Sequence, residues 1–126
     1  MRLELKDDLP FVSVQVNYRG KTTLIPSVLI DTGFATTILS ADRVAEIDIR
    51  PSPQDRLYSI RGVGGSEVVF ARQVDFLQVD DRRLSGFEIE VGGMDYGFDI
   101  HGILGMDSLT SAGAVIDLQN LQIRFR

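Results

Sequence analysis

The sequence predicts a small all-β domain with one or two short helices. Near the start of the chain Val12, Val14 and Val16 alternate with polar residues, which is the period of a half-buried strand. Further β-rich segments bounded by turn residues recur along the chain, and no linker, repeat or low-complexity stretch separates them. Because 126 residues with 44% hydrophobic content are enough for one compact core, we expect residues 1–126 to form a single domain.

Composition excludes several classes of function. The net charge is −5 and most basic residues are scattered, so we expect no nucleic-acid partner. The chain has no cysteine, which excludes thiol catalysis and disulfides and fits a reducing compartment. The first residues lack the apolar core of a signal peptide, and no stretch approaches the roughly 20 apolar residues that span a bilayer. We therefore expect a cytoplasmic protein with no membrane partner.

The first predicted element is a β-hairpin. Arg19-Gly20 offers a turn between the alternating Val12–Val16 segment and a second strand from Lys21 to Ile30. Pro26 falls inside this second strand. Because proline donates no ladder hydrogen bond, it predicts an edge position or a bulge there.

The middle of the chain predicts one short helix followed by strands. Ser40 is expected to cap a helix of at most about two turns, which closes before Pro51. The segments from Glu67 to Val79 and from Phe87 to Val91 are β-rich, and the charged run Asp80–Arg83 is interpreted as the solvated turn between them.

The end of the chain predicts a short helical turn after Asp107 and then a hairpin of Ala114–Asp117 with Leu121–Phe125. Both ends of the chain carry alternating apolar residues. Because exposed strand edges invite pairing, we expect these ends to pair between chains. The residues concerned are Leu3, Leu5, Ile123 and Phe125.

The tripeptide Asp31-Thr32-Gly33 places one carboxylate where a buried strand turns, after the apolar run Val28–Ile30. It is a signature of aspartic proteases, although by itself a plain turn is the simpler interpretation, because all three residue types favour turns. Peptide hydrolysis of this type needs two facing carboxylates. The chain has one such tripeptide, so the second carboxylate must come from another copy, and we expect a homodimer.

Two further segments favour the protease interpretation over the plain turn. Ile60–Gly65 carries three glycines between apolar residues, which is typical of a flexible hairpin tip that closes over a cleft as a flap. Gly102–Asp107 holds the apolar pair Ile103-Leu104 between glycines and leads into a helix. The order of the three motifs along one chain carries more weight than any one of them.

In that order the sequence resembles the retropepsins, the retroviral-type aspartic proteases of clan AA, from about Phe11 to Phe125. It is similar in particular to the retroviral-protease-like domain of DNA-damage-inducible ubiquitin-shuttle proteins, through Gly62-Val63-Gly64, Leu104–Leu109 and Ile116–Leu118. The resemblance implies a closed β-barrel in which the Ile103-Leu104-Gly105 strand passes next to the catalytic loop. It also implies that two chains form one active site.

The resemblance further implies a role for each site residue. Asp31 and its symmetry mate share one proton and activate a water without metal or cofactor. Thr32 braces the two loops across the dimer axis, and Gly33 leaves room for a substrate backbone. The flap is formed by Arg61, Gly62, Val63, Gly64 and Gly65, and the substrate cleft by Phe34, Ala35, Ile103, Leu104 and Gly105.

Two positions depart from the family pattern. Phe34 stands where retropepsins usually carry alanine, and it either narrows a subsite or packs into the core. His101 is the only histidine, and because no serine or cysteine motif accompanies it, we assign it a structural rather than a catalytic role.

The sequence leaves three functions open. The first is an endopeptidase that acts on extended polypeptide segments, which the unobstructed Asp31 favours. The second is a catalytically inactive dimeric module that binds peptides or holds partners together. The third is a monomer whose carboxylate pair forms only transiently.

Overall fold

The computed structural model of the protein describes residues 1–62, 65–94 and 99–126, with the backbone alone for 61, 62, 65 and 66. It is mostly β-structure with short helices, which confirms the all-β fold class. None of the helices in the described part of the chain is long and apolar enough to cross a membrane. The elements are β1 (Glu4–Lys6), β2 (Leu9–Tyr18), β3 (Lys21–Ile30), β4 (Ile38–Ser40), α1 (Ala41–Val44), the 3-10 helix η1 (Ala45–Ile47), β5 (Leu57–Gly62), β6 (Gly65–Gln73), β7 (Phe76–Val79), β8 (Arg82–Ser85), β9 (Glu88–Gly92), β10 (Gly102–Leu104), α2 (Met106–Ala112), β11 (Ala114–Asp117) and β12 (Gln122–Phe125).

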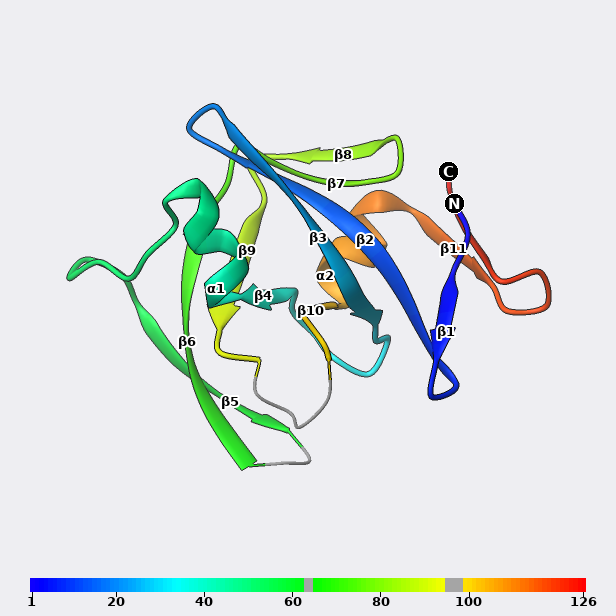
Figure 1. Cartoon of the computed structure of the whole chain (residues 1–126), viewed down its shortest axis with the longest axis horizontal. Helices are drawn as coiled ribbons and strands as arrows, with labels where there is room; N and C mark the ends of the chain where they lie inside the picture. Colours follow the sequence, from blue (N-terminus) through cyan, green and yellow to red (C-terminus); the bar gives the residue numbers. More distant parts are fainter. Residues whose placement is uncertain (63–64, 95–98) are drawn as a thin grey trace.

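Ten strands form one curved sheet (Figure 1). Nine of them follow the order β5-β6-β9-β4-β10-β3-β2-β7-β8, and β1 pairs with β2 beside this path. β11 and β12 form a separate two-stranded sheet. β10 lies parallel to β3, and β4 lies parallel to β9. Among the described residues no ladder joins the two ends of this order, β5 and β8. The closed barrel implied by the resemblance therefore stays a prediction.

The β2–β3 hairpin is confirmed, and it turns at Arg19 and Gly20 with φ angles of 50° and 83°. Two positive φ angles are typical of the hairpin turn whose twist matches the flanking strands. Pro26 lies before the part of β3 that pairs with β10, which begins at Val28. The predicted bulge is confirmed: the register shifts between Val12 and Val14, and Ser27 has a φ of 58°.

The predicted turn Asp80–Arg83 is too long. Only Asp80-Asp81 turns, and Arg82 and Arg83 begin β8, an edge strand that the sequence analysis missed. The Arg83 guanidinium lies 3.8 Å from the centre of the Phe76 ring on the neighbouring strand. An arginine on an exposed edge strand keeps its charged group in water while its side chain covers an aromatic ring. The charges of Arg82 and Arg83 are therefore compatible with a β-strand.

The helix predicted after Ser40 is present as α1 and η1, but Ser40 occupies the cap position without a side-chain cap bond. The helical segment ends at Asp48, whose φ is 65°, before Pro51 is reached. The chain therefore leaves the helix through a left-handed residue rather than through proline.

The terminal strands pair within one chain, which corrects the expectation that they pair between chains. Leu3 N–H donates to Leu121 O at 2.8 Å, and Ile123 N–H donates to Met1 O at 2.9 Å. Leu3 and Ile123 are 1% and 0% exposed in their own core. The N- and C-termini consequently lie close together beside β11 (Figure 1).

Buried side chains form two clusters. The larger one fills the space enclosed by β2, β3, β7 and β9 and reaches the terminal sheet. The smaller one connects the segment after β3 with the β5–β6 hairpin, and half-buried Phe34 packs against it. Its buried members are Phe11, Ile38, Val69, Met94, Ile100 and Ile103.

The β11–β12 hairpin is confirmed, and its stability is expected to depend on pH through Asp117. The side-chain amide and the backbone N–H of Asn120, and then Arg124, hold the pKa of Asp117 below its ordinary value of 3.8. The resulting stabilisation is complete above the unfolded-state pKa and is lost as the pH falls through the lower folded-state pKa. Replacing Asp117 with Asn should therefore lower Tm more at about pH 6 than at about pH 2.5, as thermal unfolding would show. An equal loss at both values would contradict this assignment.

Candidate active site

Asp31 lies directly after β3, at the start of a tight loop. Its N–H donates to Leu104 O at 3.1 Å, and its own carbonyl accepts the N–H of Phe34 at 3.2 Å. Oδ1 of its half-buried side chain accepts the N–H of Gly33 at 2.9 Å. Thr32 and Gly33 are exposed. The loop therefore holds the carboxylate in a fixed orientation while its tip faces solvent.

β10 and α2 hold this loop in place through backbone hydrogen bonds. β10 inserts between β3 and β4 and places Leu104 opposite Ile30, the last residue before Asp31. The first two N–H groups of α2 donate to the loop: Met106 to Phe34 O at 2.8 Å, and Asp107 to Ala35 O at 3.1 Å. A helix start has unpaired N–H groups, and here the loop carbonyls satisfy two of them.

The five residues predicted for the substrate cleft separate into two groups in the protomer. Ala35 is exposed and Phe34 is half-buried. Ile103 and Leu104 are 7% and 1% exposed, and Gly105 is also buried. The second group thus lies beneath the Asp31 loop, where it fixes the position of the loop.

Thr37 connects the loop to α2, and the sequence analysis did not single it out. The Thr37 hydroxyl donates to Asp107 Oδ1 at 2.7 Å and accepts the N–H of Gly105 at 3.2 Å. Ser108 Oγ lies 2.7 Å from the same hydroxyl and donates to Gly105 O at 3.1 Å. Thr37 is 0% exposed and Gly105 is buried, so no water is at hand to replace the hydroxyl as the partner of the Gly105 N–H.

Replacing Thr37 with Val is expected to lower the free energy of unfolding by about 1 to 3 kcal/mol, because a buried N–H and a carboxylate oxygen each lose a partner. Replacing it with Ser retains the hydroxyl and should cost less. Urea unfolding of the two variants against the parent measures the difference. A loss in the Ser variant with none in the Val variant would mean that the methyl group, rather than the hydrogen bonds, stabilises this position.

The expected flap corresponds to the β5–β6 hairpin, which extends to the lower left of Figure 1. Arg61 pairs with Ser66, and Gly62 pairs with Gly65, so the glycine-rich segment continues the ladder of the two strands. Val63 and Gly64, the remaining flap residues, lie outside the described part of the chain.

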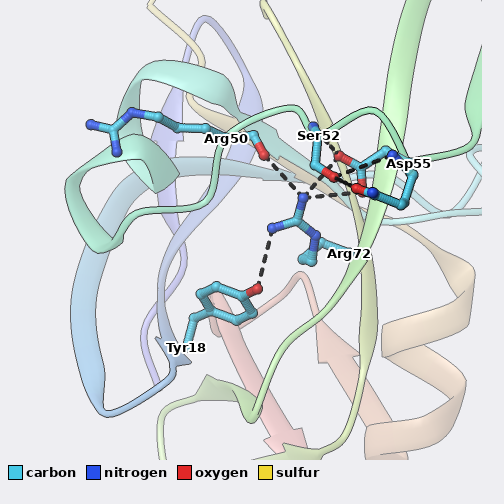
Figure 2. A network of polar contacts seen from close by, with 6 residues as sticks. Tyr18, Arg50, Ser52, Asp55 and Arg72 are labelled. Atoms are coloured by element: carbon cyan, nitrogen blue, oxygen red, sulfur yellow. Dashed lines mark hydrogen bonds and ion pairs between the residues drawn. The ribbon is translucent and has the colours of Figure 1, made fainter.

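Arg72 anchors the base of this hairpin (Figure 2). Its Nη2 lies 2.8 and 3.1 Å from the two carboxylate oxygens of Asp55 and donates to Arg50 O at 2.9 Å, while Nη1 donates to Tyr18 Oη at 3.3 Å. Partial burial alone would lower the pKa of Arg72, but the hydrogen bonds to Tyr18 and Asp55 outweigh it and raise the pKa. The network ties the segment that leads into β5 to strands β2 and β6.

His101 lies just before β10 with a polar partner on each ring nitrogen. Nδ1 is 3.0 Å from Pro26 O, and Nε2 is 2.9 Å from Asp99 Oδ1. Its backbone N–H donates to Ser27 O, and its carbonyl accepts the N–H of Ser40. These contacts agree with the structural role expected for His101. In the described part of the chain no cluster of His, Asp or Glu has the arrangement of a metal site.

The sequence matches one known protein family over the segment that forms this site. Residues 12–108 match the family model described as aspartyl protease, a range that begins in β2 and ends in α2 and so includes the Asp31 loop, the β5–β6 hairpin and β10. A search of curated proteins found no match. Because the match extends over more than half of the chain, the protein belongs to the aspartyl protease family.

Proposed function

We propose that the protein is an aspartic endopeptidase of retropepsin type that works as a homodimer, with Asp31 of each copy supplying one carboxylate of a shared pair. The observation that carries the proposal is the Asp31 loop in a member of this family: the carboxylate is oriented by Gly33 N–H, and the loop is held from below by β10 and α2. One chain has a single Asp-Thr-Gly sequence, so two facing carboxylates require two copies.

The proposed chemistry follows from the repulsion between two facing carboxylates. Two such groups cannot both ionise at short distance, so the proposed pair holds one shared proton. The ionised Asp31 removes a proton from a water molecule, which attacks the carbonyl carbon of the peptide bond. The protonated partner donates its proton to the developing oxyanion. The first Asp31 then passes the proton it took from water to the amide nitrogen, the C–N bond breaks, and a hydroxyl proton of the intermediate returns to the pair as the acid and the amine leave. No metal or cofactor takes part in this scheme.

The other loop residues would position the substrate and the partner subunit. In the proposed dimer, the exposed Thr32 hydroxyl reaches across the two-fold axis and Gly33 admits the substrate backbone. The β5–β6 hairpin closes over an extended peptide and holds it like an added strand. We propose that Phe34, half-buried against the smaller cluster, narrows one subsite. A cytoplasmic location and a relationship to the ubiquitin-shuttle domain complete the proposal.

Subunit mixing tests the shared pair. The parent protein is assayed on unfolded polypeptides between about pH 4 and 7, with and without a roughly ninefold excess of Asp31→Asn chains and with substrate in large excess. If each dimer needs two aspartates, free exchange of subunits should reduce cleavage to roughly one tenth, because few dimers then contain two parent chains. An equal excess of an unrelated protein is the control.

Three outcomes of this assay are distinguishable. Unchanged cleavage in the mixture would contradict the shared pair. No cleavage by the parent, at any concentration at which light scattering shows a dimer, would favour the inactive peptide-binding module. Cleavage that appears only as the monomer begins to associate would favour the transient pair.

A further inference from the structure

The β5–β6 hairpin separates from the rest of the sheet before its tip. The ladder between β6 and β9 ends at the pair Phe70–Val91, whereas the ladder between β5 and β6 continues to Gly62 and Gly65. Both strands accordingly extend beyond the end of β9 (Figure 1). Residues 58–62 and 65–69 form the free part of the hairpin, because in the described ladders they pair only with each other. Side-chain contacts with the body of the protein therefore decide how this part is held.

Glu67, on β6, spans the gap where the two strands separate. Continued by three residues beyond Phe70–Val91, the antiparallel register would place Glu67 opposite Met94. Oε1 of the half-buried Glu67 side chain accepts the Met94 N–H at 3.1 Å. A carboxylate oxygen thus takes the backbone donor that a carbonyl of the neighbouring strand would take in a continuous ladder. The free part of the hairpin is therefore tied to the segment that follows β9.

The backbone around Met94 is shaped to receive this carboxylate. Met94 has a φ of 58°, a left-handed conformation that costs energy in a residue with a side chain and persists where the surroundings hold it. Gly92 leaves the room that the carboxylate needs. A Cβ at Gly92 would lie 2.8 Å from Glu67 Oε1 and 2.9 Å from Val69 Cγ1. The contact thus combines a strained donor with a close approach that only glycine permits.

The residue that Glu67 binds is packed into the body of the protein beside the Asp31 loop. The Met94 side chain is 5% exposed and belongs to the smaller buried cluster, together with Ile103. Phe34, from the Asp31 loop, packs against the same cluster. A bond to the Met94 N–H consequently refers the free part of the hairpin to the same group of side chains that the Asp31 loop contacts.

We infer that Glu67 is a positioning residue for the proposed reaction: its bond to the Met94 N–H holds the free part of the hairpin at a fixed place relative to the Asp31 loop. The inference rests on the proposed function, which assigns this hairpin to the flap. The bond lies away from the reacting atoms, so it supports the bound substrate and the transition state equally. Its loss should therefore raise KM and leave kcat nearly unchanged.

Three substitutions separate the acceptor oxygen of Glu67 from its charge and its bulk. Glu67→Gln keeps an oxygen at the same reach, Glu67→Asp keeps the charge on a shorter side chain, and Glu67→Leu keeps the bulk alone. On a peptide with a bond that the parent cleaves, the Asp and Leu variants should raise KM at least about fivefold with kcat within about twofold. The Gln variant should stay within about twofold of the parent in KM. The matched control is Glu88→Leu, which replaces an exposed glutamate on β9 and should behave as the parent.

Hydrogen exchange of the Met94 amide tests the bond without any substrate. A hydrogen-bonded amide exchanges only when its bond opens. The Met94 N–H should exchange at least about fivefold faster in the Asp and Leu variants than in the parent, and the Gln variant should retain most of the protection. Far-UV circular dichroism checks that each variant is folded. If the Leu variant unfolds, the comparison of Asp with Gln decides, because both keep a polar side chain at this position.

The inference is overturned if the Met94 amide exchanges alike in the parent and in all three Glu67 variants, or if the Gln variant raises KM as much as the Leu variant does. Faster exchange in the Asp and Leu variants of a protein that cleaves nothing would support the bond that holds the hairpin and reject the proposed function. Cleavage by the parent, with the same KM in all three variants, would do the reverse.

Discussion

Asp31→Asn is expected to reduce cleavage of unfolded polypeptides by about 10³-fold or more, because one substitution removes both carboxylates of the shared pair. An amide has no acidic proton to donate to an oxyanion and is too weak a base to activate water. Initial rates measured on the same substrate at equal protein concentration give the ratio. Cleavage at the parent rate would reject the aspartic mechanism.

The substitution should leave the loop intact, which makes it a clean test. Asn has the size of Asp, and its side-chain oxygen can still accept the N–H of Gly33, the bond that is 2.9 Å long in the parent. We therefore expect the Tm and the dimer mass of the variant to match those of the parent. If the variant loses activity and unfolds as well, the loss of activity is not evidence about catalysis, and the dependence of the parent's cleavage rate on protein concentration decides instead.

Gly105→Ala is expected to have the largest effect on stability. A Cβ at this position would lie 2.1 Å from Thr36 O, 2.5 Å from Thr36 C and 2.9 Å from Phe34 O. All three atoms belong to the backbone of the Asp31 loop, so no side-chain rotation relieves the clash. We expect a loss of at least about 3 kcal/mol in the free energy of unfolding, a large part of the stability of a small domain.

Gly93→Ala is the matched control for this prediction. Its Cβ would meet only the end of the Glu67 side chain, at 3.5 Å, which is an ordinary contact. Urea unfolding should separate the two variants by at least about 2 kcal/mol. A small loss at Gly105 would mean that the loop shifts easily away from β10, contrary to the rigid support described for Asp31.

The local motifs of the active-site region could be predicted from sequence, because each depends on neighbouring residues. Asp31-Thr32-Gly33 forms a turn after an apolar strand, Arg19-Gly20 supplies the positive φ angles of a hairpin, and Pro26 requires a bulge. The family match over residues 12–108 agrees with the order of the motifs. What could not be predicted were pairings between distant segments.

Thr37 and Arg82 illustrate the two kinds of failure. The Thr37 hydroxyl meets Asp107 across 70 residues of sequence, and neither residue type indicates a partner in advance. Arg82 and Arg83 look like a solvated turn because they are charged, yet an edge strand leaves one side open to water and accommodates them. The terminal strands were expected to pair between chains. Their alternation of apolar and polar residues indicates that they pair, but it does not indicate whether the partner strand belongs to the same chain or to another one.

The parallel pairing of β10 with β3 also determines when the Asp31 loop can form during synthesis of the chain. The acceptor for Asp31 N–H is Leu104, and the groups that hold the loop belong to residues 105–108. Contacts between segments so far apart along the chain form late in folding, because the chain must first lose the conformational entropy of the intervening segment. A nascent chain that has not yet reached Leu104 therefore carries the aspartate without its support, and the Asp31 loop can take its final form only after residues 104–108 have emerged from the ribosome.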